Sequence, residues 1–441
     1  RQMRLLLRNG RVLDPAQKID MVADVLLGDE RVLAIGKDAA GAKADQEVDC
    51  TNLWVCPGFI DVHVHLREPG QEYKETVITG THAAAAGGFT TICCMPNTTP
   101  PLDNPHLIVG LRERMFDPEA GGVAVEPICA LTKGMKGEQL TNLAELQEAG
   151  AVAASDDAFP IQNAEMLRRG MEYCKMLNLP VVTHCEDKSL SDGGVMNAGR
   201  ISTILGLKGM PREAEEVQVA RNCILSLYTQ CRLHIAHVST WWSVELIKAA
   251  KGLGAPITAE ACPHHFILTE EAIEEYDTNT KCSPPLRTQR DVEAIIQGLA
   301  DGVIDCIASD HAPHANFEKE TTFAEAAFGI AGIETLVGLT LTHLTHKGVL
   351  SPLETVRRLS TNPSKAVNLM GGSLRTDMLS LAQVTVVDPN MEWTVDAQVF
   401  RSKARNTPFH GWKLKGKAMM TIWSDIIYRD PLFLGITSQG K

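Results

Sequence analysis

Short apolar runs separated by turn residues fill roughly the first 55 residues of the chain. The runs lie at residues 5–7, 25–27 and 32–35, with Asn9-Gly10 and Gly28-Asp29 between them. Runs of this length bounded by Gly, Asn and Asp are typical of antiparallel strands, and no amphipathic helical pattern occurs among them. The N-terminal segment is therefore predicted to form a small antiparallel sheet.

From about Trp54 the pattern changes to apolar runs that are each followed by a helical pattern. Strand-like runs such as FIDVHVH, FTTICCM, PVVTH and RLHIAHVS alternate with helix-like segments such as AEMLRRGMEYCKML and EAEEVQVARNCILSLY. Alternating units of this kind imply a parallel sheet covered by helices, and so many in succession favour a closed (β/α)8 barrel. A doubly wound open sheet is the alternative.

After about Gly371 short strand-like runs return, as AQVTVVD, KLKGKAMMTIW and DIIYR. The sequence therefore predicts an α/β fold with a (β/α)8 TIM-like barrel at residues 56–370. A small β-sandwich domain is expected from both chain termini, residues 1–55 and 371–441. The stretch from Asp310 to about Gly329 has few strand signals and is expected to be a loop over the active-site face of the barrel.

Composition excludes several classes of protein. The 441 residues carry 42 Lys and Arg against 54 Asp and Glu, a net charge of −12, which argues against a nucleic-acid partner. No run approaches the ~18 apolar residues of a membrane helix, so no membrane association is expected, and the chain start lacks an apolar stretch of signal-peptide length. The twelve cysteines include no CxxC pair, so we expect reduced thiols and a cytoplasmic protein.

His63 and His65 are the first candidates for chemistry. They stand two residues apart in the apolar run FIDVHVH, so their side chains project to the same face of a strand and both imidazoles can reach one metal ion. Two histidines inside an apolar strand cost desolvation free energy unless their nitrogens have partners. The pair predicts a metal site.

Polar residues also close four later apolar runs. Asp156 and Asp157 follow AVAAS, His184 follows PVVT, His237 follows RLHIA and Asp310 follows VIDCIAS. The carboxyl ends of barrel strands surround a single mouth, so these residues are expected to converge with the two histidines. At this point either Asp156 or Asp157 could be the member of the set.

Four histidines and two carboxylates exceed the ligands of one tetrahedral zinc with an open position, but they suit two ions bridged by a carboxylate. The mixture of imidazole and carboxylate favours Zn²⁺ and also admits Mn²⁺ or Co²⁺. Such ions polarise a carbonyl and activate water, so the implied reaction is hydrolysis or its reverse.

A series of motifs carries a family resemblance over nearly the whole chain. In order, they are DVHVHLREPGQEYKE, GGFTTICCMPNTTP, SDDAFPIQ, THCED, GMPREAEEV, AHVS, ACPHH, PPLR and ASDHAPH. Together they resemble the dihydroorotases of the long, aspartate-bridged bacterial type, within the amidohydrolase superfamily. Other amidohydrolases commonly place a carboxylated lysine at the bridge, and AVAASDDAFP contains no lysine.

The resemblance implies a set of metal ligands and one or two Zn²⁺ per chain. It implies that one zinc is held by His63, His65 and Asp310, the other by His184 and His237, with Asp157 as the bridge. Asp310 is also the predicted catalytic acid and base, because it ends a strand, contacts one ion by resemblance and keeps an oxygen free. His184 and His237 are worse candidates, since metal binding leaves them no lone pair for a proton.

Substrate contacts are expected beside the metal. Dihydroorotate and N-carbamoyl-L-aspartate both carry an α-carboxylate, and Arg67, on the same face as His65, has the planar guanidinium that binds a carboxylate through two hydrogen bonds. The resemblance adds His65, Asn97, His314, Phe328 and Gly329 as substrate contacts.

Ser283 is a departure from the family pattern. It stands before PPLR, where the family usually has an asparagine whose amide meets the substrate. A hydroxyl is shorter and cannot donate and accept across the same span, so we expect a water or Asn279 to compensate, or a modest loss of affinity.

Four further residues are expected to stay outside the ligand set. His264 and His265 are interpreted as residues of the wall or behind the ligands, and His311 as pointing away from its neighbour Asp310. Cys185 is not expected to be a nucleophile where metal-activated water is available.

The function that the resemblance implies is a zinc-dependent cyclic amidohydrolase, a dihydroorotase that reversibly interconverts N-carbamoyl-L-aspartate and (S)-dihydroorotate in de novo pyrimidine (UMP) synthesis. The alternatives are a hydantoinase- or allantoinase-type cyclic amidase, and a non-catalytic structural partner of aspartate transcarbamoylase. Expected partners are the small-molecule substrate and, as further options, a second copy in a homodimer or aspartate transcarbamoylase.

Overall fold

Eight parallel strands form the centre of the computed structural model, which describes residues 3–377, 379–433 and 437–439. They are hydrogen-bonded side by side in chain order, from the first to the last. The barrel strands are β6 (Phe59–Val64), β7 (Phe89–Cys94), β8 (Ala124–Ala130), β9 (Ala153–Ser155), β10 (Val181–Thr183), β13 (Leu233–Ile235), β14 (Ile257–Ala261) and β15 (Cys306–Ile307). A strand order that follows the chain belongs to a barrel, whereas a doubly wound sheet reverses direction at a switch point.

The barrel is nearly closed by contacts between its first strand and the segment after its last strand. Val64 forms a parallel bridge with His311. The backbone N–H of His65 donates to the carbonyl of His311 at 2.8 Å. Chain segments about 250 residues apart therefore meet at the carboxyl ends of β6 and β15, where the predicted site residues lie.

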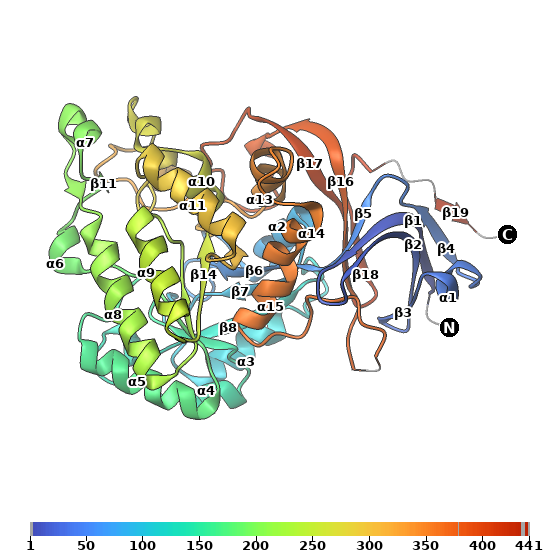
Figure 1. Ribbon diagram of the computed structural model, residues 1–441, viewed down its shortest axis with the longest axis horizontal. Helices are drawn as coiled ribbons and strands as arrows, with labels where there is room; N and C mark the ends of the chain where they lie inside the picture. The colour runs from blue at the N-terminus through green and yellow to red at the C-terminus, as the bar shows by residue number, and fades with distance from the viewer. Residues whose placement is uncertain (1–2, 378, 434–436, 440–441) are drawn as a thin grey trace.

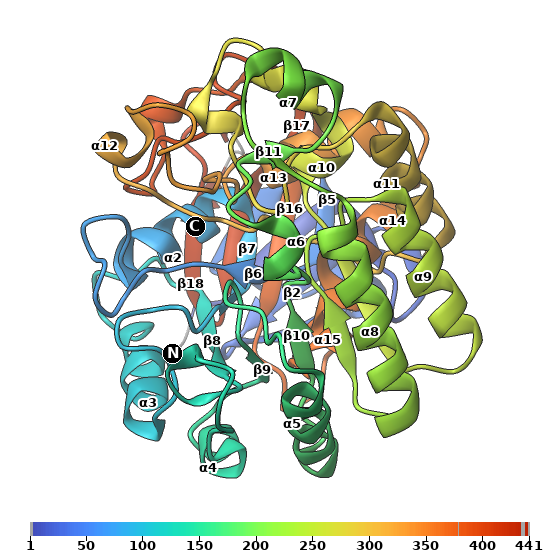
Figure 2. The same cartoon turned by 90° about the vertical axis from the view of Figure 1, so that its left-hand side faces the viewer.

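Helices cover the outside of the barrel (Figures 1 and 2). The main helix between each barrel strand and the next is α2 (Val77–Gly87), α3 (Pro105–Arg114), α4 (Leu143–Glu148), α5 (Ala164–Leu177), α8 (Glu213–Thr229), α9 (Trp241–Gly252) and α11 (Gln289–Asp301), in chain order. Toward the end of the barrel follow α13 (Leu336–Thr340), α14 (Pro352–Val356) and α15 (Asn362–Ala366), with π-helical turns at Leu341–Thr345 and Arg357–Thr361. Shorter elements decorate the loops, namely α6 (Lys188–Ser191), α7 (Arg200–Leu205), α10 (Pro263–Ile267), α12 (Asn316–Lys319), β11 (Met196–Asn197) and β12 (Gly209–Met210).

Helix α2 shows how local sequence sets an element boundary. Its N-cap Thr76 accepts a hydrogen bond from the backbone of Thr79, whose hydroxyl accepts one from the backbone of Thr76. This reciprocal cap satisfies N–H groups that have no partner inside the helix. The helix ends at Gly88, which has a φ of 96°, a left-handed conformation that glycine adopts without steric cost.

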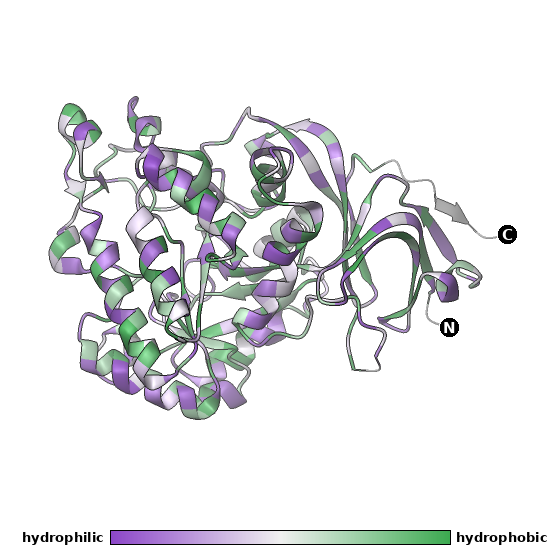
Figure 3. Ribbon diagram, viewed as in Figure 1, coloured by the Kyte–Doolittle hydropathy of each residue, from purple (hydrophilic) through white to green (hydrophobic). Residues whose placement is uncertain are grey.

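The barrel core has two apolar layers because neighbouring strand residues face opposite ways. On β7, Ile92 and Cys94 belong to one buried cluster, whereas Cys93 belongs to another together with Met95, the residue after the strand. Figure 3 shows largely apolar barrel strands, while the surrounding helices carry polar and apolar residues on different sides. Both faces of this sheet are therefore covered, as a parallel sheet requires.

The two terminal segments form one β-rich domain beside the barrel, with both chain ends at its far side (Figure 1). Nine strands join in one sheet, with the main order β18-β17-β16-β5-β1-β2-β3 and with β4 pairing with β1 and β19. They are β1 (Leu5–Asp14), β2 (Ile19–Gly28), β3 (Arg31–Ile35), β4 (Gln46–Asp49), β5 (Trp54–Pro57), β16 (Gln383–Thr394), β17 (Lys413–Trp423), β18 (Ile426–Arg429) and β19 (Thr437–Gln439); the short helix α1 (Lys37–Ala40) lies before β4.

The predicted fold class, a (β/α)8 barrel with a β-rich domain from both termini, is confirmed. The sandwich expected for that domain takes the form of one branched sheet, because β1 pairs with β4 near its start and with β5 farther along. Apolar residues of β1, β2, β5, β16 and β17 share a separate buried cluster. The predicted boundaries at residues 55 and 371 stay a prediction. No helix in the described residues has the length and apolar character needed to cross a membrane.

Candidate active site

His63 and His65 lie at the end of β6 with their rings on the same side, 5.3 Å between centroids. Each ring is held by a hydrogen bond at Nδ1. The Nδ1 atom of His63 lies 2.5 Å from Oε1 of Glu260, and that of His65 lies 2.8 Å from Oδ1 of Asn97. Because Nδ1 is engaged in both rings, Nε2 is the nitrogen that each presents to the mouth of the barrel.

Asp310 meets both of these Nε2 atoms. Its Oδ1 lies 3.1 Å from Nε2 of His63 and 3.2 Å from Nε2 of His65. Burial raises the pKa of Asp310, but the positive charge of His63 and the hydrogen bond with His65 together lower this pKa by more than burial raises it. The net shift is downward, so the carboxyl group is ionised at neutral pH.

Asp157 lies between two pairs of histidines, one pair for each carboxylate oxygen. Its Oδ2 is 3.5 Å from Nε2 of both His63 and His65. Its Oδ1 is 3.4 Å from Nδ1 of His184 and 3.7 Å from Nε2 of His237. The same carboxylate thus belongs to two groups of potential metal ligands, as a bridging position requires.

Asp156, the alternative that the sequence left open, turns the other way. It accepts hydrogen bonds from the backbone N–H groups of Leu131 (2.8 Å) and Thr132 (3.1 Å) and from the hydroxyl of Thr132. Burial raises its pKa to about 6, although these donors lower it. The structure therefore brings Asp157 to the histidines and leaves Asp156 to hold the loop at residues 131–132.

The donor set fits metal ions. Nε2 of His63 and Oδ1 of Asp157 are buried without a hydrogen-bond partner among the described residues. A buried polar atom without a partner costs about 1 to 3 kcal/mol, and a cation between imidazole and carboxylate would remove that cost. Three overlapping groups of residues can each hold an ion: His63, His65 and Asp157; His63, His237 and Asp310; and Asp157, His184 and His237.

Arg67 is a buried cation beside this cluster. Its Nε donates to the carbonyl of Pro313 at 3.1 Å, and its Nη2 lies 3.3 Å from Nε2 of His314. Burial and the charge of Arg67 lower the pKa of His314 to about 2, so the imidazole is neutral. The two groups that contact the guanidinium are therefore uncharged, and the carboxylates of Asp310, Glu318, Glu75 and Asp157 act on it only through their charge.

Two of the remaining predicted contacts, Phe328 and Gly329, lie beside His314. Its Nε2 lies 2.8 Å from the carbonyl of Phe328, and the backbone N–H of Gly329 donates to the carbonyl of Lys281 at 2.9 Å. A cavity of about 230 Å³ is lined by Ser283, Phe328 and His184 among others. Ser283 thus lines the same cavity as His184, whereas Asn97 contacts His65.

Several residues here were missed by the sequence analysis, above all Glu260. A glutamate inside the apolar run ITAEAC was the available signal, because a buried acid in a strand needs a partner. Lys74 was also missed; its Nζ lies 3.3 Å from Nδ1 of His314 and 2.8 Å from Oε1 of Glu318.

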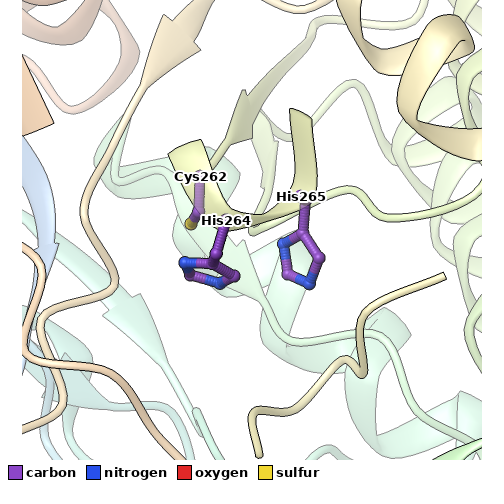
Figure 4. Close-up of side chains that lie close together, drawn as sticks. All are labelled: Cys262, His264 and His265. Atoms are coloured by element: carbon purple, nitrogen blue, oxygen red, sulfur yellow. The ribbon is translucent and has the colours of Figure 1, made fainter. Parts of the chain in front are cut away.

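A second donor cluster follows β14, where Cys262, His264 and His265 lie close together at the short helix α10 (Figure 4). His265 bonds through Nε2 to the carbonyl of Pro284 at 2.8 Å, next to Ser283. This contact joins His265 to the segment that carries Ser283, and its predicted place in the wall of the site stays a prediction. Burial lowers the pKa of His264 to about 4, so it is neutral at physiological pH.

His311 and Cys185 lie outside the ligand set. His311 points to Glu75, with 2.9 Å between Nε2 and Oε2. Burial raises the pKa of Cys185 to about 12, so its sulfur stays a thiol. All twelve cysteines are buried and free of disulfides.

Comparison with known proteins gives the same picture at the level of sequence. A family model described as Dihydro-orotase-like matches residues 53–243. A dihydroorotase of Thermoanaerobacter sp. (strain X514) is 50% identical over 95% of this chain and 96% of that protein. A dihydroorotase of Syntrophotalea carbinolica is 49% identical over 95% of this chain and 97% of that protein.

Solved structures share the fold at lower identity. An L-hydantoinase (dihydropyrimidinase) from Arthrobacter aurescens aligns with a TM-score of 0.85 at 24% identity, covering 97% of this chain and 96% of that one. A dihydropyrimidinase from Brevibacillus agri aligns with a TM-score of 0.84 at 24% identity, covering 98% and 96%.

A (β/α)8 barrel that gathers histidines and aspartates at its strand ends, beside a β-rich domain, is an architecture that this chain shares with the solved hydantoinase and dihydropyrimidinase. The chain belongs to the dihydroorotase family, because it is 49% to 50% identical to these two dihydroorotases over 95% of its length. It is an enzyme, a hydrolase that acts on a cyclic amide. The predicted family and enzyme class are confirmed, and the roles of individual residues stay predictions.

The two neighbouring aspartates can be separated by experiment. We expect Asp157→Asn to remove most bound zinc, because an amide cannot supply two anionic oxygens to the two histidine pairs. Asp156→Asn keeps an acceptor for the loop N–H groups and should retain parental zinc, with a lower free energy of unfolding. Elemental analysis and urea unfolding of both variants test this; equal zinc loss in both would contradict it.

Proposed function

We propose that this enzyme is a dihydroorotase that reversibly interconverts N-carbamoyl-L-aspartate and (S)-dihydroorotate in de novo pyrimidine (UMP) synthesis, with one or two Zn²⁺ per chain. The observation that carries the proposal is Arg67, a buried cation next to the histidine–aspartate cluster whose two hydrogen-bonding partners, the carbonyl of Pro313 and the imidazole of His314, are neutral and form no ion pair with it. Both proposed substrates bring an α-carboxylate, and a charged carboxylate is the partner that such a guanidinium needs.

Zinc is proposed at His63, His65, Asp310, His184 and His237, with Asp157 shared between the two sides. When bound there, Zn²⁺ would polarise the amide carbonyl and favour ionisation of water. The imidazole-rich donor set with carboxylates suits this metal. The buried Nε2 of His63 and Oδ1 of Asp157, without hydrogen-bond partners among the described residues, support the assignment.

Arg67 holds the substrate α-carboxylate in this proposal, with His314 and Asn97 beside it. The contacts of Arg67 to Pro313 and His314 keep its side chain turned into the site. Phe328 and Gly329 lie at the edge of the same proposed substrate site, because the carbonyl of Phe328 contacts His314. Ser283, in the cavity wall, replaces the amide that the family usually offers.

Asp310 moves the proton. In ring opening a water oxygen adds to the amide carbon, and Asp310 accepts the proton that the water loses. The same carboxyl group then gives that proton to the departing amide nitrogen, and the reverse sequence closes the ring. The depressed pKa of Asp310 keeps it ionised before the attack, as a base must be.

The cellular compartment and the protein partners of the enzyme are proposed from its cysteines and its family. Twelve buried free thiols favour a reducing compartment, and we propose the cytoplasm. A homodimer and a complex with aspartate transcarbamoylase are the partner proposals.

Activity of the purified chain toward dihydroorotate, hydantoin and allantoin, measured side by side, tests the proposed function. Dihydroorotate should be hydrolysed far faster, because hydantoin lacks the carboxylate that Arg67 binds. A higher kcat/KM for hydantoin or allantoin would overturn the assignment in favour of another cyclic amidase. Inactivity toward all three would favour a structural role.

Arg67→Lys should lower kcat/KM for dihydroorotate mainly by raising KM, since an ammonium replaces the planar fork. Loss of a charge-assisted pair in a closed site is worth roughly 2 to 4 kcal/mol, about 30- to 1000-fold. Arg114→Lys is the matched control, because Arg114 lies on α3 in an ion pair with Glu68. An unchanged KM in the Arg67 variant would place this residue outside the substrate site.

Asp310→Asn should retain most of its zinc, while kcat falls by at least ~10²-fold, the low end for general acid–base catalysis. In the parent enzyme the rate of ring opening should fall at acid pH, where the carboxylate becomes protonated. That acidic limb should disappear in the variant. A variant with near-parental kcat and an unmoved limb would assign the proton transfer elsewhere, with His314 as the next residue to test.

A further inference from the structure

Glu260 lies behind both histidine pairs, on β14 between β13 and β15. Its side chain is fully buried. Oε1 accepts a hydrogen bond from the backbone N–H of His237 at 3.2 Å and lies 2.5 Å from Nδ1 of His63. Oε2 lies 2.8 Å from Nε2 of His234. One carboxylate therefore contacts a residue of each half of the cluster.

The first contact selects the nitrogen that His63 presents to the site. A carboxylate at Nδ1 can only accept, so Nδ1 of His63 carries a proton and Nε2 is the nitrogen left to bind a cation. Nε2 is the atom that faces Asp310 at 3.1 Å and Asp157 at 3.5 Å and has no hydrogen-bond partner among the described residues.

The second contact acts on the backbone of His237. This residue has a φ of 29°, in the left-handed region that non-glycine residues rarely adopt. Such a conformation persists where surrounding contacts hold it. The N–H of His237 is fixed by Glu260, while its ring Nε2 lies 2.9 Å from Nδ1 of His184.

His234 completes the arrangement on the side away from the cluster. It bonds to Oε2 of Glu260 through Nε2 and to Oγ1 of Thr258, 2.7 Å away, through Nδ1. Both carboxylate oxygens of Glu260 are thus engaged, and its side chain has one well-defined orientation. A rigid partner behind a metal-bound histidine raises the affinity of the site because the ligand is already oriented.

From this geometry we infer that Glu260 is a positioning residue for both halves of the metal cluster, through the ring of His63 and the backbone of His237. The inference rests on the proposed function in one respect, namely that the cluster binds zinc. It assigns to Glu260 no contact with metal or substrate. Its consequence is that the charge of Glu260 controls zinc affinity on both sides of Asp157.

Glu186 offers a natural comparison. It is also a buried carboxylate on a cluster histidine, with 2.8 Å between its Oε2 and Nε2 of His184, and it also contacts the exposed Lys188. Glu186 touches only one side of the cluster. Loss of the charge of Glu186 should therefore leave zinc affinity on the His63 and His65 side of the cluster unchanged.

The test is zinc affinity of the full-length protein, measured by competition with a chromophoric chelator on Glu260→Gln, Glu260→Leu and Glu186→Gln. Loss of such an outer partner typically weakens metal binding 10- to 100-fold. We expect about 10-fold weaker binding of every zinc in Glu260→Gln, which keeps the shape. Glu260→Leu offers no hydrogen-bond acceptor to His63 or His237, so its zinc affinity should fall by about 100-fold, the upper end of that range. Glu186→Gln should keep at least one zinc at parental affinity.

The Tm of each zinc-free protein separates positioning from stability. A positioning role predicts that Glu260→Gln keeps the parental zinc-free Tm while its zinc affinity falls. A lower zinc-free Tm with unchanged zinc affinity would overturn the inference, as would equal behaviour of Glu260→Gln and Glu186→Gln. If the parent binds no zinc, the proposed function fails as well; if the parent binds zinc and Glu260→Gln binds it equally, only this inference fails.

Discussion

The carboxylate of Asp157, buried between two pairs of imidazoles, is the constraint on which the active site depends. Its two oxygens face different histidine pairs at 3.4 to 3.7 Å. Charged and polar groups held this close, away from water, are costly unless every one has a partner. The surrounding structure can be understood as the means of holding these groups in place and supplying those partners.

The barrel brings the groups together by its topology. Successive strands end at one mouth, so residues from the ends of β6, β9, β10, β13 and β15 meet, although about 250 residues separate the first from the last. Backbone conformation then aims individual side chains. Arg67, His237 and Asp310 all have positive φ values, of 61°, 29° and 47°. These three backbone conformations are unfavourable for residues other than glycine, so contacts with neighbouring residues must stabilise them.

Hydrogen bonds from behind decide which nitrogen each histidine presents. Asn97 meets Nδ1 of His65, Glu260 meets Nδ1 of His63, and Glu186 meets Nε2 of His184. Imidazole has two chemically different nitrogens, and only a fixed partner on one of them leaves the other consistently available. The orientation of these rings thus depends on residues that do not belong to the histidine–aspartate cluster. In the same way, His314 is held at Nδ1 by Lys74 and at Nε2 by the carbonyl of Phe328.

The sequence by itself determined the class of fold and the chemical character of the site. Repeated βα units indicated the barrel, and polar residues at strand ends indicated the cluster, since both follow from local periodicity. It could not choose between Asp156 and Asp157, because neighbouring residues share one strand end and only the position of Thr132 shows which carboxylate is already engaged. Nor could it reveal Glu260, about 200 residues from His63. Its proximity arises only when the strands assemble side by side, because contact between distant segments is a property of the tertiary structure.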